Sequence, residues 1–141
     1  MRLLVDVNVL LDHALEREPG NGPSSLLIHV CGQVHDAYIA WHSLSIFHYI
    51  LKRKGHTDAS ARAWILSVMS WTTVASTTNE DAVRAASLPI QDFEDAMQAA
   101  SAKSASADFI ISQNDSDFVN SPVPCVTPRA FLQQFHPDLL P

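Results

Sequence analysis

Met1-Arg-Leu-Leu-Val-Asp-Val-Asn-Val-Leu-Leu-Asp12 opens the chain and decides its fold class. The apolar run Leu3–Val5 stops at Asp6, and apolar residues then recur at helical spacing as far as Leu15. A short run of this kind, bounded by a polar residue, is typical of a buried parallel strand. Asp6 is therefore expected at the carboxyl end of a strand, where open α/β sheets hold ligands and metals.

The rest of the chain alternates between strand and helix patterns. Further strands are predicted at residues 37–41, 72–75, 108–112 and 124–127. Helices are predicted at residues 7–15, 24 to about 34, 43–54, 79–88, 92–106 and 128–135, and a further helix is predicted to begin after a cap at Thr57 or Asp58. The segment Pro19–Pro23 is predicted to be a loop. This alternation indicates one doubly wound, three-layer α/β/α domain over residues 1–141, with a parallel sheet of about five strands.

Composition narrows the class of protein. The 141 residues are 47% hydrophobic and 17% charged, which is typical of a globular chain. The net charge of −6 disfavours polyanion binding unless a cation or a basic patch intervenes, and Lys52-Arg53-Lys54 is the one basic cluster. No signal-peptide pattern and no apolar stretch of membrane-spanning length occur, so a cytoplasmic protein without a membrane partner is expected.

Acidic residues follow two strands and begin one helix. Asp6 ends the first strand, Asp115 and Asp117 follow the fourth, and Asp95 lies near the amino end of the helix that leads into the fourth. A crossover helix runs antiparallel to the strands, so its amino end lies beside their carboxyl ends. If the first and fourth strands are neighbours, these carboxylates converge on one crevice.

Convergence of carboxylates requires a cation. Two carboxylates about 4 Å apart repel by roughly 4 kcal/mol at an effective dielectric constant of 20. Hard oxygen ligands that leave coordination positions open suit Mg²⁺ or Mn²⁺, which retain waters and contact substrate phosphates. Such a site activates water and stabilises charge on phosphorus, so phosphodiester hydrolysis is its natural chemistry.

Each acid also has a structural interpretation. Asp92 is expected to cap the helix that follows it, and Glu94 to complement the helix dipole while pointing away from Asp95. Asp108, Asp115 and Asp117 fit turns, Asp12 fits a solvated helix face, and Asp95 alone fits either a ligand or a dipole partner.

Three segments resemble the motifs of PIN-domain nucleases. They are the opening Leu3–Asp12 stretch, Asp92-Phe-Glu-Asp-Ala96 with its small-residue helix, and Ala107-Asp-Phe-Ile-Ile-Ser-Gln-Asn-Asp-Ser-Asp-Phe118. The tail Ser121–Leu132 is similar to the closing strand and helix of that family. The resemblance spans essentially the whole chain, and its specificity comes from the order and spacing of the motifs.

The resemblance implies a metal-dependent ribonuclease acting on single-stranded RNA. Small members of this kind are commonly VapC-type toxins of toxin–antitoxin systems, dimeric and neutralised by a small antitoxin. Carried over by position, the metal ligands and catalytic acids are Asp6, Asp95 and Asp117. Supporting residues are Asn8, Ser43, Ser112, Asn114 and Asp115, with Ser112 where the family often has Thr.

Two positions depart from the family pattern. Many PIN domains carry a Glu in the helix after the second strand, yet residues 41–51 contain no acid; His42, Ser43 and Ser45 occupy that neighbourhood. Gln113 stands where Arg or Lys is usual, which removes a positive charge from the expected phosphate site. These departures motivate a rival hypothesis, a catalytically attenuated PIN-like module that binds RNA or protein. A phosphatase with Asp6 as nucleophile is a weaker rival, because Asn8 replaces the second acid of the Asp-x-Asp pattern of haloacid-dehalogenase-like enzymes.

Overall fold

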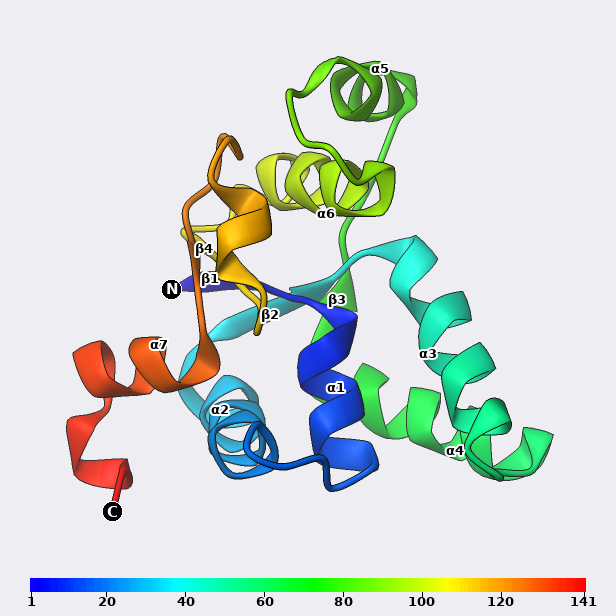
Figure 1. Ribbon diagram of the computed structural model, residues 1–141, viewed down its shortest axis with the longest axis vertical. Coiled ribbons are helices and arrows are strands. Elements are labelled where there is room, and N and C mark those ends of the chain that lie inside the picture. Colours follow the sequence, from blue (N-terminus) through cyan, green and yellow to red (C-terminus); the bar gives the residue numbers. More distant parts are fainter.

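A parallel sheet lies at the centre of the computed structural model, which describes residues 1–141 (Figure 1). Its strands are β1 (Arg2–Val5), β2 (Asp36–Ile39), β3 (Thr72–Val74), β4 (Phe109–Ile111) and β5 (Cys125–Val126). They are ordered β3-β2-β1-β4-β5, and every pairing is parallel. The chain order reverses at β1, so the crevice of the switch point lies between β1 and β4, which meets the condition under which the acids after these strands converge.

Helices cover both faces of this sheet. They are α1 (Val7–Ala14), α2 (Asn21–Val34), α3 (Trp41–Arg53), α4 (Asp58–Met69), α5 (Asn79–Ser87), α6 (Phe93–Ser104) and α7 (Pro128–Phe135), with 3₁₀ turns η1 (Asp115–Phe118) and η2 (Pro137–Leu139). Helices α5 and α6 lie on one side, and the other five lie on the opposite side (Figure 1). The predicted three-layer α/β/α architecture is confirmed. None of the helices has the length and hydropathy needed to cross a bilayer.

Alternation along β1 divides the core between the two layers. Leu3 and Val5 pack with α1, α2, α3, α4 and α7, and Leu4 packs with α6 and the segment that follows β4. All three side chains are fully buried. This is the period-two pattern of a strand covered on both faces, which explains the uninterrupted apolar run at the start of the chain.

Two helices begin earlier than predicted. Helix α2 starts at Asn21 and includes Pro23, because the N–H groups of a first helical turn have no intrahelical partner and a proline costs nothing there. Helix α3 starts at Trp41, which was assigned to a buried strand; its side chain is 69% exposed. The loop prediction holds for residues 19 and 20 but is wrong for residues 21–23, and the strand prediction for Trp41 is wrong.

Candidate active site

Asp6 lies at the carboxyl end of β1 with its side chain only 4% exposed. Its Oδ2 accepts a hydrogen bond from Ser112 Oγ at 2.7 Å, and its Oδ1 accepts from Val7 N at 2.7 Å and Gln98 Nε2 at 3.2 Å. Burial raises the pKa of Asp6 to about 6 although the Ser112 bond lowers it, and the charge of Glu94 raises it further. Asp6 is thus both the N-cap of α1 and a carboxylate at the switch point.

Asp92 fixes the start of α6 and so places two further acids. Its Oδ1 accepts from Glu94 N at 2.8 Å and Asp95 N at 3.3 Å, which confirms its predicted capping role. Burial raises the pKa of Asp95 to about 7, assisted by the negative charges of Glu94, Asp92, Asp6 and Asp117, in that order. Asp95 therefore lies in the field of the acids from β1 and from the segment after β4.

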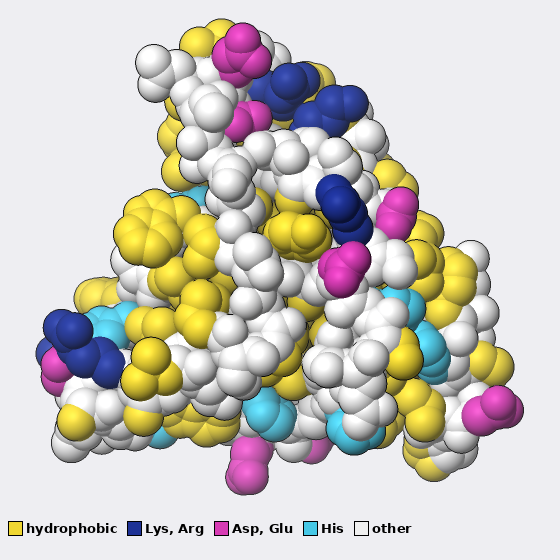
Figure 2. Space-filling model, turned by 180° about the vertical axis from the view of Figure 1, so that it is seen from behind, with side chains coloured by type: hydrophobic (Ala, Val, Ile, Leu, Met, Phe, Trp, Pro, Cys, Tyr) yellow, Lys and Arg dark blue, Asp and Glu magenta, His cyan; other side chains and the backbone are white.

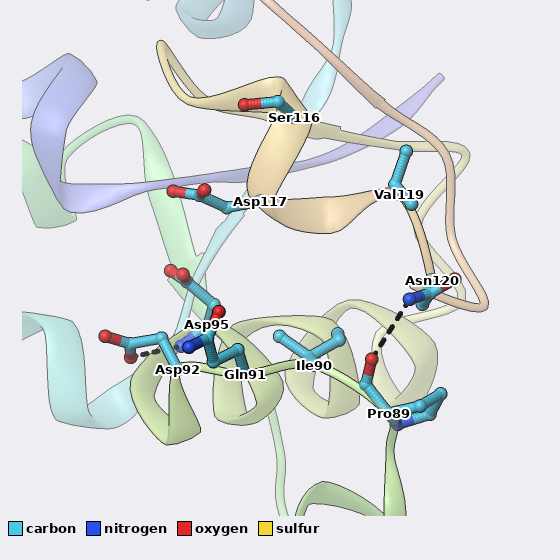
Figure 3. Close-up of a pocket in the computed structure, with 9 residues that line it drawn as sticks. All are labelled: Pro89, Ile90, Gln91, Asp92, Asp95, Ser116, Asp117, Val119 and Asn120. Atoms are coloured by element: carbon cyan, nitrogen blue, oxygen red, sulfur yellow. Dashed lines mark hydrogen bonds between the residues drawn. The ribbon is translucent and has the colours of Figure 1, made fainter.

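Asp117 belongs to η1, a short helical turn that the sequence reading treated as loop. It faces α6 across a cleft of about 540 Å³ that is lined by Pro89, Ile90, Gln91, Asp92, Asp95, Ser116, Asp117, Val119 and Asn120. Figure 3 shows the carboxylates of Asp95 and Asp117 directed toward the same space. Asp115, a predicted supporting residue, lines a separate hollow with Pro124 and Cys125 and does not line this cleft.

Gln98 connects Asp6 to α3 and α6. The side chain is fully buried, and its Nε2 lies 2.6 Å from Ser43 Oγ, 3.1 Å from Glu94 Oε1 and 3.2 Å from Asp6 Oδ1. Its Oε1 is buried without any hydrogen-bond partner. Ser43, a predicted supporting residue, is fully buried and contacts Asp6 only through this amide.

Glu94 does not point away from Asp95, as the sequence reading expected. Ligand atoms of Asp92, Glu94 and Asp95 all lie within 4.8 Å of one another. Glu94 Oε1 accepts from His42 Nε2 at 2.9 Å as well as from Gln98. Burial raises the pKa of Glu94, but these two hydrogen bonds lower it more, and the net result is a pKa below the usual value.

Sequence reasoning missed Glu94, His42 and Gln98 as members of this site. The available signal was the i, i+4 spacing of Glu94 and Gln98, which places both side chains on one face of α6. Contact with His42 could not be read from the sequence, because it depends on how α3 and α6 meet at the edge of the sheet.

The polar residues after β4 hold the strand ends together. Asn8 Nδ2 donates to Ser112 Oγ at 3.1 Å, and Asn8 Oδ1 accepts from Gln113 N at 3.3 Å. Asn114 N donates to Ser112 Oγ at 3.1 Å, while the Asn114 side chain makes no hydrogen bond to the protein. The structure thus brings Asn8 and Ser112 to Asp6 and leaves the Asn114 side chain apart from this network.

Gln113 and Asp12 have structural roles. Gln113 Nε2 donates to Asp12 Oδ2 at 2.8 Å and to Ser24 Oγ at 3.2 Å, so its amide ties the segment after β4 to α1 and α2. Asp12 is 7% exposed and pairs with Arg17 at 2.9 Å. The prediction that Asp12 lies on a solvated face is wrong, because the loop before α2 folds back over it.

The donor set suits a hard divalent cation. Asp6 follows β1, Asp95 belongs to α6 and Asp117 to η1, and the ligand atoms that their side chains offer are all carboxylate oxygens. Burial is the main cause of the raised pKa values of Asp6 and Asp95, and the negative charge of Glu94 raises both further; a bound cation would offset these effects. The acidic group Asp92, Glu94 and Asp95 offers only carboxylate oxygens, which suits a divalent cation that prefers oxygen ligands.

The sequence itself carries a family signature at this site. The PIN domain family matches residues 2–116, which include Asp6 and Asp95 and end one residue before Asp117. The chain belongs to the PIN domain family. This membership indicates a nuclease in general terms, and no curated protein matches the sequence.

Several solved structures have the same fold at low sequence identity. A chain of VapBC2 from Rickettsia felis, crystallised with a promoter DNA fragment, aligns with a TM-score of 0.70 at 13% identity, covering 90% of this chain and 98% of that one. VapBC-1 from nontypeable Haemophilus influenzae gives 0.67 at 14% identity, with 92% and 99% covered. FitAcB from Neisseria gonorrhoeae gives 0.64 at 14% identity, with 90% and 98% covered.

Proposed function

We propose that this PIN domain is a Mg²⁺- or Mn²⁺-dependent endoribonuclease that hydrolyses phosphodiesters in single-stranded RNA. The observation that carries the proposal is the cleft that Asp95 of α6 and Asp117 of η1 line, together with Asp6 at the end of β1, whose charge acts on Asp95. Asp6, Asp95 and Asp117 would hold the ion, which when bound activates water and stabilises the charge that develops on phosphorus.

The surrounding residues keep these acids in place. Ser112 donates to Asp6 Oδ2, and the Val7 N–H fixes Oδ1, so this carboxylate has one orientation before any ligand arrives. Asn8 in turn holds Ser112, which joins the ends of β1 and β4. Pre-organisation of this kind reduces the cost of arranging ligands at the moment of binding.

The biological role proposed here is that of a toxin in a toxin–antitoxin pair. The structural neighbours carry the names VapBC2, VapBC-1, FitAB and FitAcB, and two of them are described as bound to a DNA fragment. By this analogy the chain acts in the cytoplasm as a homodimer and is neutralised by a small antitoxin. Co-purification with the product of a short adjacent reading frame, and loss of RNA cleavage in that complex, would test the role directly.

The activity itself is tested with a fluorescently labelled single-stranded RNA. We expect cleavage by the wild-type protein with Mn²⁺, none with EDTA, and a loss of about 100-fold in Asp6→Asn and Asp95→Asn. Glu80→Gln, an exposed acid on α5, removes the same charge away from the cleft and should leave the rate unchanged. Equal cleavage by all four preparations would indicate a contaminating nuclease and overturn the proposal.

The attenuated binding module is the alternative outcome of the same experiment. It predicts RNA binding without cleavage and without any effect of Mn²⁺. If the wild-type protein binds Mn²⁺ and Asp95→Asn does not, the binding-module alternative is excluded by a measurement that does not depend on RNA cleavage.

A further inference from the structure

The carboxylate of Glu94 is attached to the site by two donors from different helices. His42 Nε2, from α3, lies 2.9 Å from Glu94 Oε1, and Gln98 Nε2, one turn further along α6, lies 3.1 Å from the same oxygen. Neither donor contacts Oε2, which makes no hydrogen bond to the protein. One oxygen is therefore fixed, and the other keeps its lone pairs for a ligand.

The amide of Gln98 joins Glu94 to Asp6. Both carboxylates accept from the one nitrogen, so Asp6 Oδ1 and Glu94 Oε1 lie on either side of a single donor. The Nε2 group of Gln98 has two hydrogens but lies within hydrogen-bond distance of three oxygen atoms, and Gln98 Oε1 is buried without a hydrogen-bond partner. Gln98 is fully buried, and a buried polar atom without a hydrogen-bond partner lowers the stability of the fold. This loss of stability has a functional reason if the carboxylates that Gln98 connects belong to a binding site.

A helix cap alone does not explain this arrangement. Asp92 already caps α6 through the N–H groups of Glu94 and Asp95. A Glu in a first helical turn complements the dipole from any exposed rotamer, without an imidazole and a buried amide to fix it. The fixed Glu94 side chain instead places a third ligand atom within 4.8 Å of those of Asp92 and Asp95.

We propose that Glu94 is a fourth carboxylate of the metal site, held in place by His42 and Gln98 and coordinating the ion through Oε2 or through a bound water. The inference rests on the proposed function, since it adds a ligand to the same site. Helix α3 has no acid of its own and contributes instead the imidazole that positions an acid of α6. Glu94 and Asp95 would then approach the ion from adjacent positions at the amino end of one helix.

The test is calorimetric titration of Mn²⁺ into the metal-free protein. We expect Glu94→Gln to weaken Mn²⁺ binding by about tenfold, because ligand charge is lost while the size of the side chain is kept. Glu80→Gln is the matched control: it makes the same Glu-to-Gln change at an exposed position of α5 outside the cleft, so a change below about threefold is expected.

His42 provides a test of positioning. His42→Ala should weaken Mn²⁺ binding in the wild-type background and should have no further effect when Glu94 is already Gln, because its contribution passes through Glu94. An additive loss in the double variant would show that His42 acts elsewhere.

Glu94→Asp is a second variant for the same ligand. It keeps the charge but shortens the side chain, so it should also bind Mn²⁺ less tightly than wild type. This variant decides the question if a thermal melt shows that Glu94→Gln does not fold.

The outcomes separate this inference from the proposed function. If wild type binds Mn²⁺, Asp95→Asn abolishes binding and Glu94→Gln binds like wild type, then Glu94 is not a ligand and the nuclease proposal stands. If wild type binds no Mn²⁺, both are overturned.

Discussion

Asp6 makes the metal-free protein less stable than it could be. Its pKa stands at about 6 in the folded chain against 3.8 for an unperturbed carboxyl, and burial is the main cause. A raised folded-state pKa contributes stability that is complete below pH 3.8 and is lost as pH rises through 6. Above that pH the folded protein carries a buried anion whose ionisation costs about 3 kcal/mol.

The variant Asp6→Asn should therefore stabilise the metal-free protein at pH 8. Asn can still accept from Val7 and Gln98, although Ser112 loses its acceptor at a cost of about 1 kcal/mol. We expect a net gain of about 1–2 kcal/mol at pH 8 that shrinks toward pH 4, measured by urea denaturation with EDTA. A variant less stable than wild type at pH 8 would contradict this account.

Gly20 lies where the loop before α2 closes over Asp12. A Cβ at this position would lie 2.1 Å from Asp12 Oδ2 and 2.8 Å from Gln113 Nε2, and both atoms are held in hydrogen bonds. Gly20→Ala should cost about 1–3 kcal/mol of unfolding free energy, because the buried contact cannot open without breaking those bonds.

Gly22→Ala is the matched control for that substitution. A Cβ there meets nothing within 4 Å, and the residue lies in the first turn of α2, so the change should be neutral or slightly stabilising. Urea denaturation of both variants checks the pair. Equal unfolding free energies of the two variants would mean that Asp12 and Gln113 can move apart without a loss of stability.

At the residue scale, the sequence predicts the positions of side chains that end a strand or cap a helix. Asp6 and Asp92 follow from local patterns, and both are where those patterns place them. Glu94 was assigned to the helix dipole, because the partners that hold it are distant in the chain: His42 is 52 residues away. Side-chain direction depends on such contacts, which no local pattern contains.

At the scale of elements, the order of strands and helices follows from periodicity. Helix α7 occupies the predicted residues, since Thr127 accepts from Ala130 N as its cap and Pro128 fits the first turn. Errors occur where tertiary contact overrides local chemistry: α2 begins within a breaker cluster, and residues 115–118 form a 3₁₀ turn. That turn carries Asp117, so the site depends on the element that was hardest to predict.

A contact between two histidines links the end of helix α7 to the start of β2. His35 Nε2 and His136 Nε2 lie 2.8 Å apart, and His35 Nδ1 lies 3.4 Å from the amino terminus. Burial, the charge of the terminus and His136 lower the pKa of His35 below 6.5. A lowered folded-state pKa means that the stability is present above pH 6.5 and is lost as pH falls through the folded value.

The variant His35→Gln should therefore lose less stability than wild type between pH 7.5 and pH 5. The difference between the two proteins isolates this pair from the acids, which titrate in both. Thermal melts at the two pH values measure it, with exposed His29→Gln on α2 as control. A His35→Gln profile parallel to that of wild type would mean that the pair does not couple to folding.

At the scale of the whole molecule, charge opposes the proposed substrate. The net charge is −6, and the cluster Lys52-Arg53-Lys54 lies at the carboxyl end of α3, about 18 Å along the helix from the amino end beside the site. On the face seen in Figure 2, Lys and Arg side chains lie in separate places and form no continuous stripe. The proposed RNA substrate would therefore meet an acidic cleft whose positive potential would have to come from the proposed cation.

Neutralising an acid of the cleft should consequently strengthen RNA binding when the metal is absent. In EDTA at low salt, Asp117→Asn should bind a labelled single-stranded RNA several-fold more tightly than wild type, although it cleaves none. Asp117 is chosen because it is exposed and lines the cleft, so the substitution leaves the buried network around Asp6 intact. Fluorescence anisotropy measures the affinity, and Glu80→Gln on α5 should show no such gain. If the variant binds the RNA no better than wild type does in EDTA, the RNA lies outside this cleft.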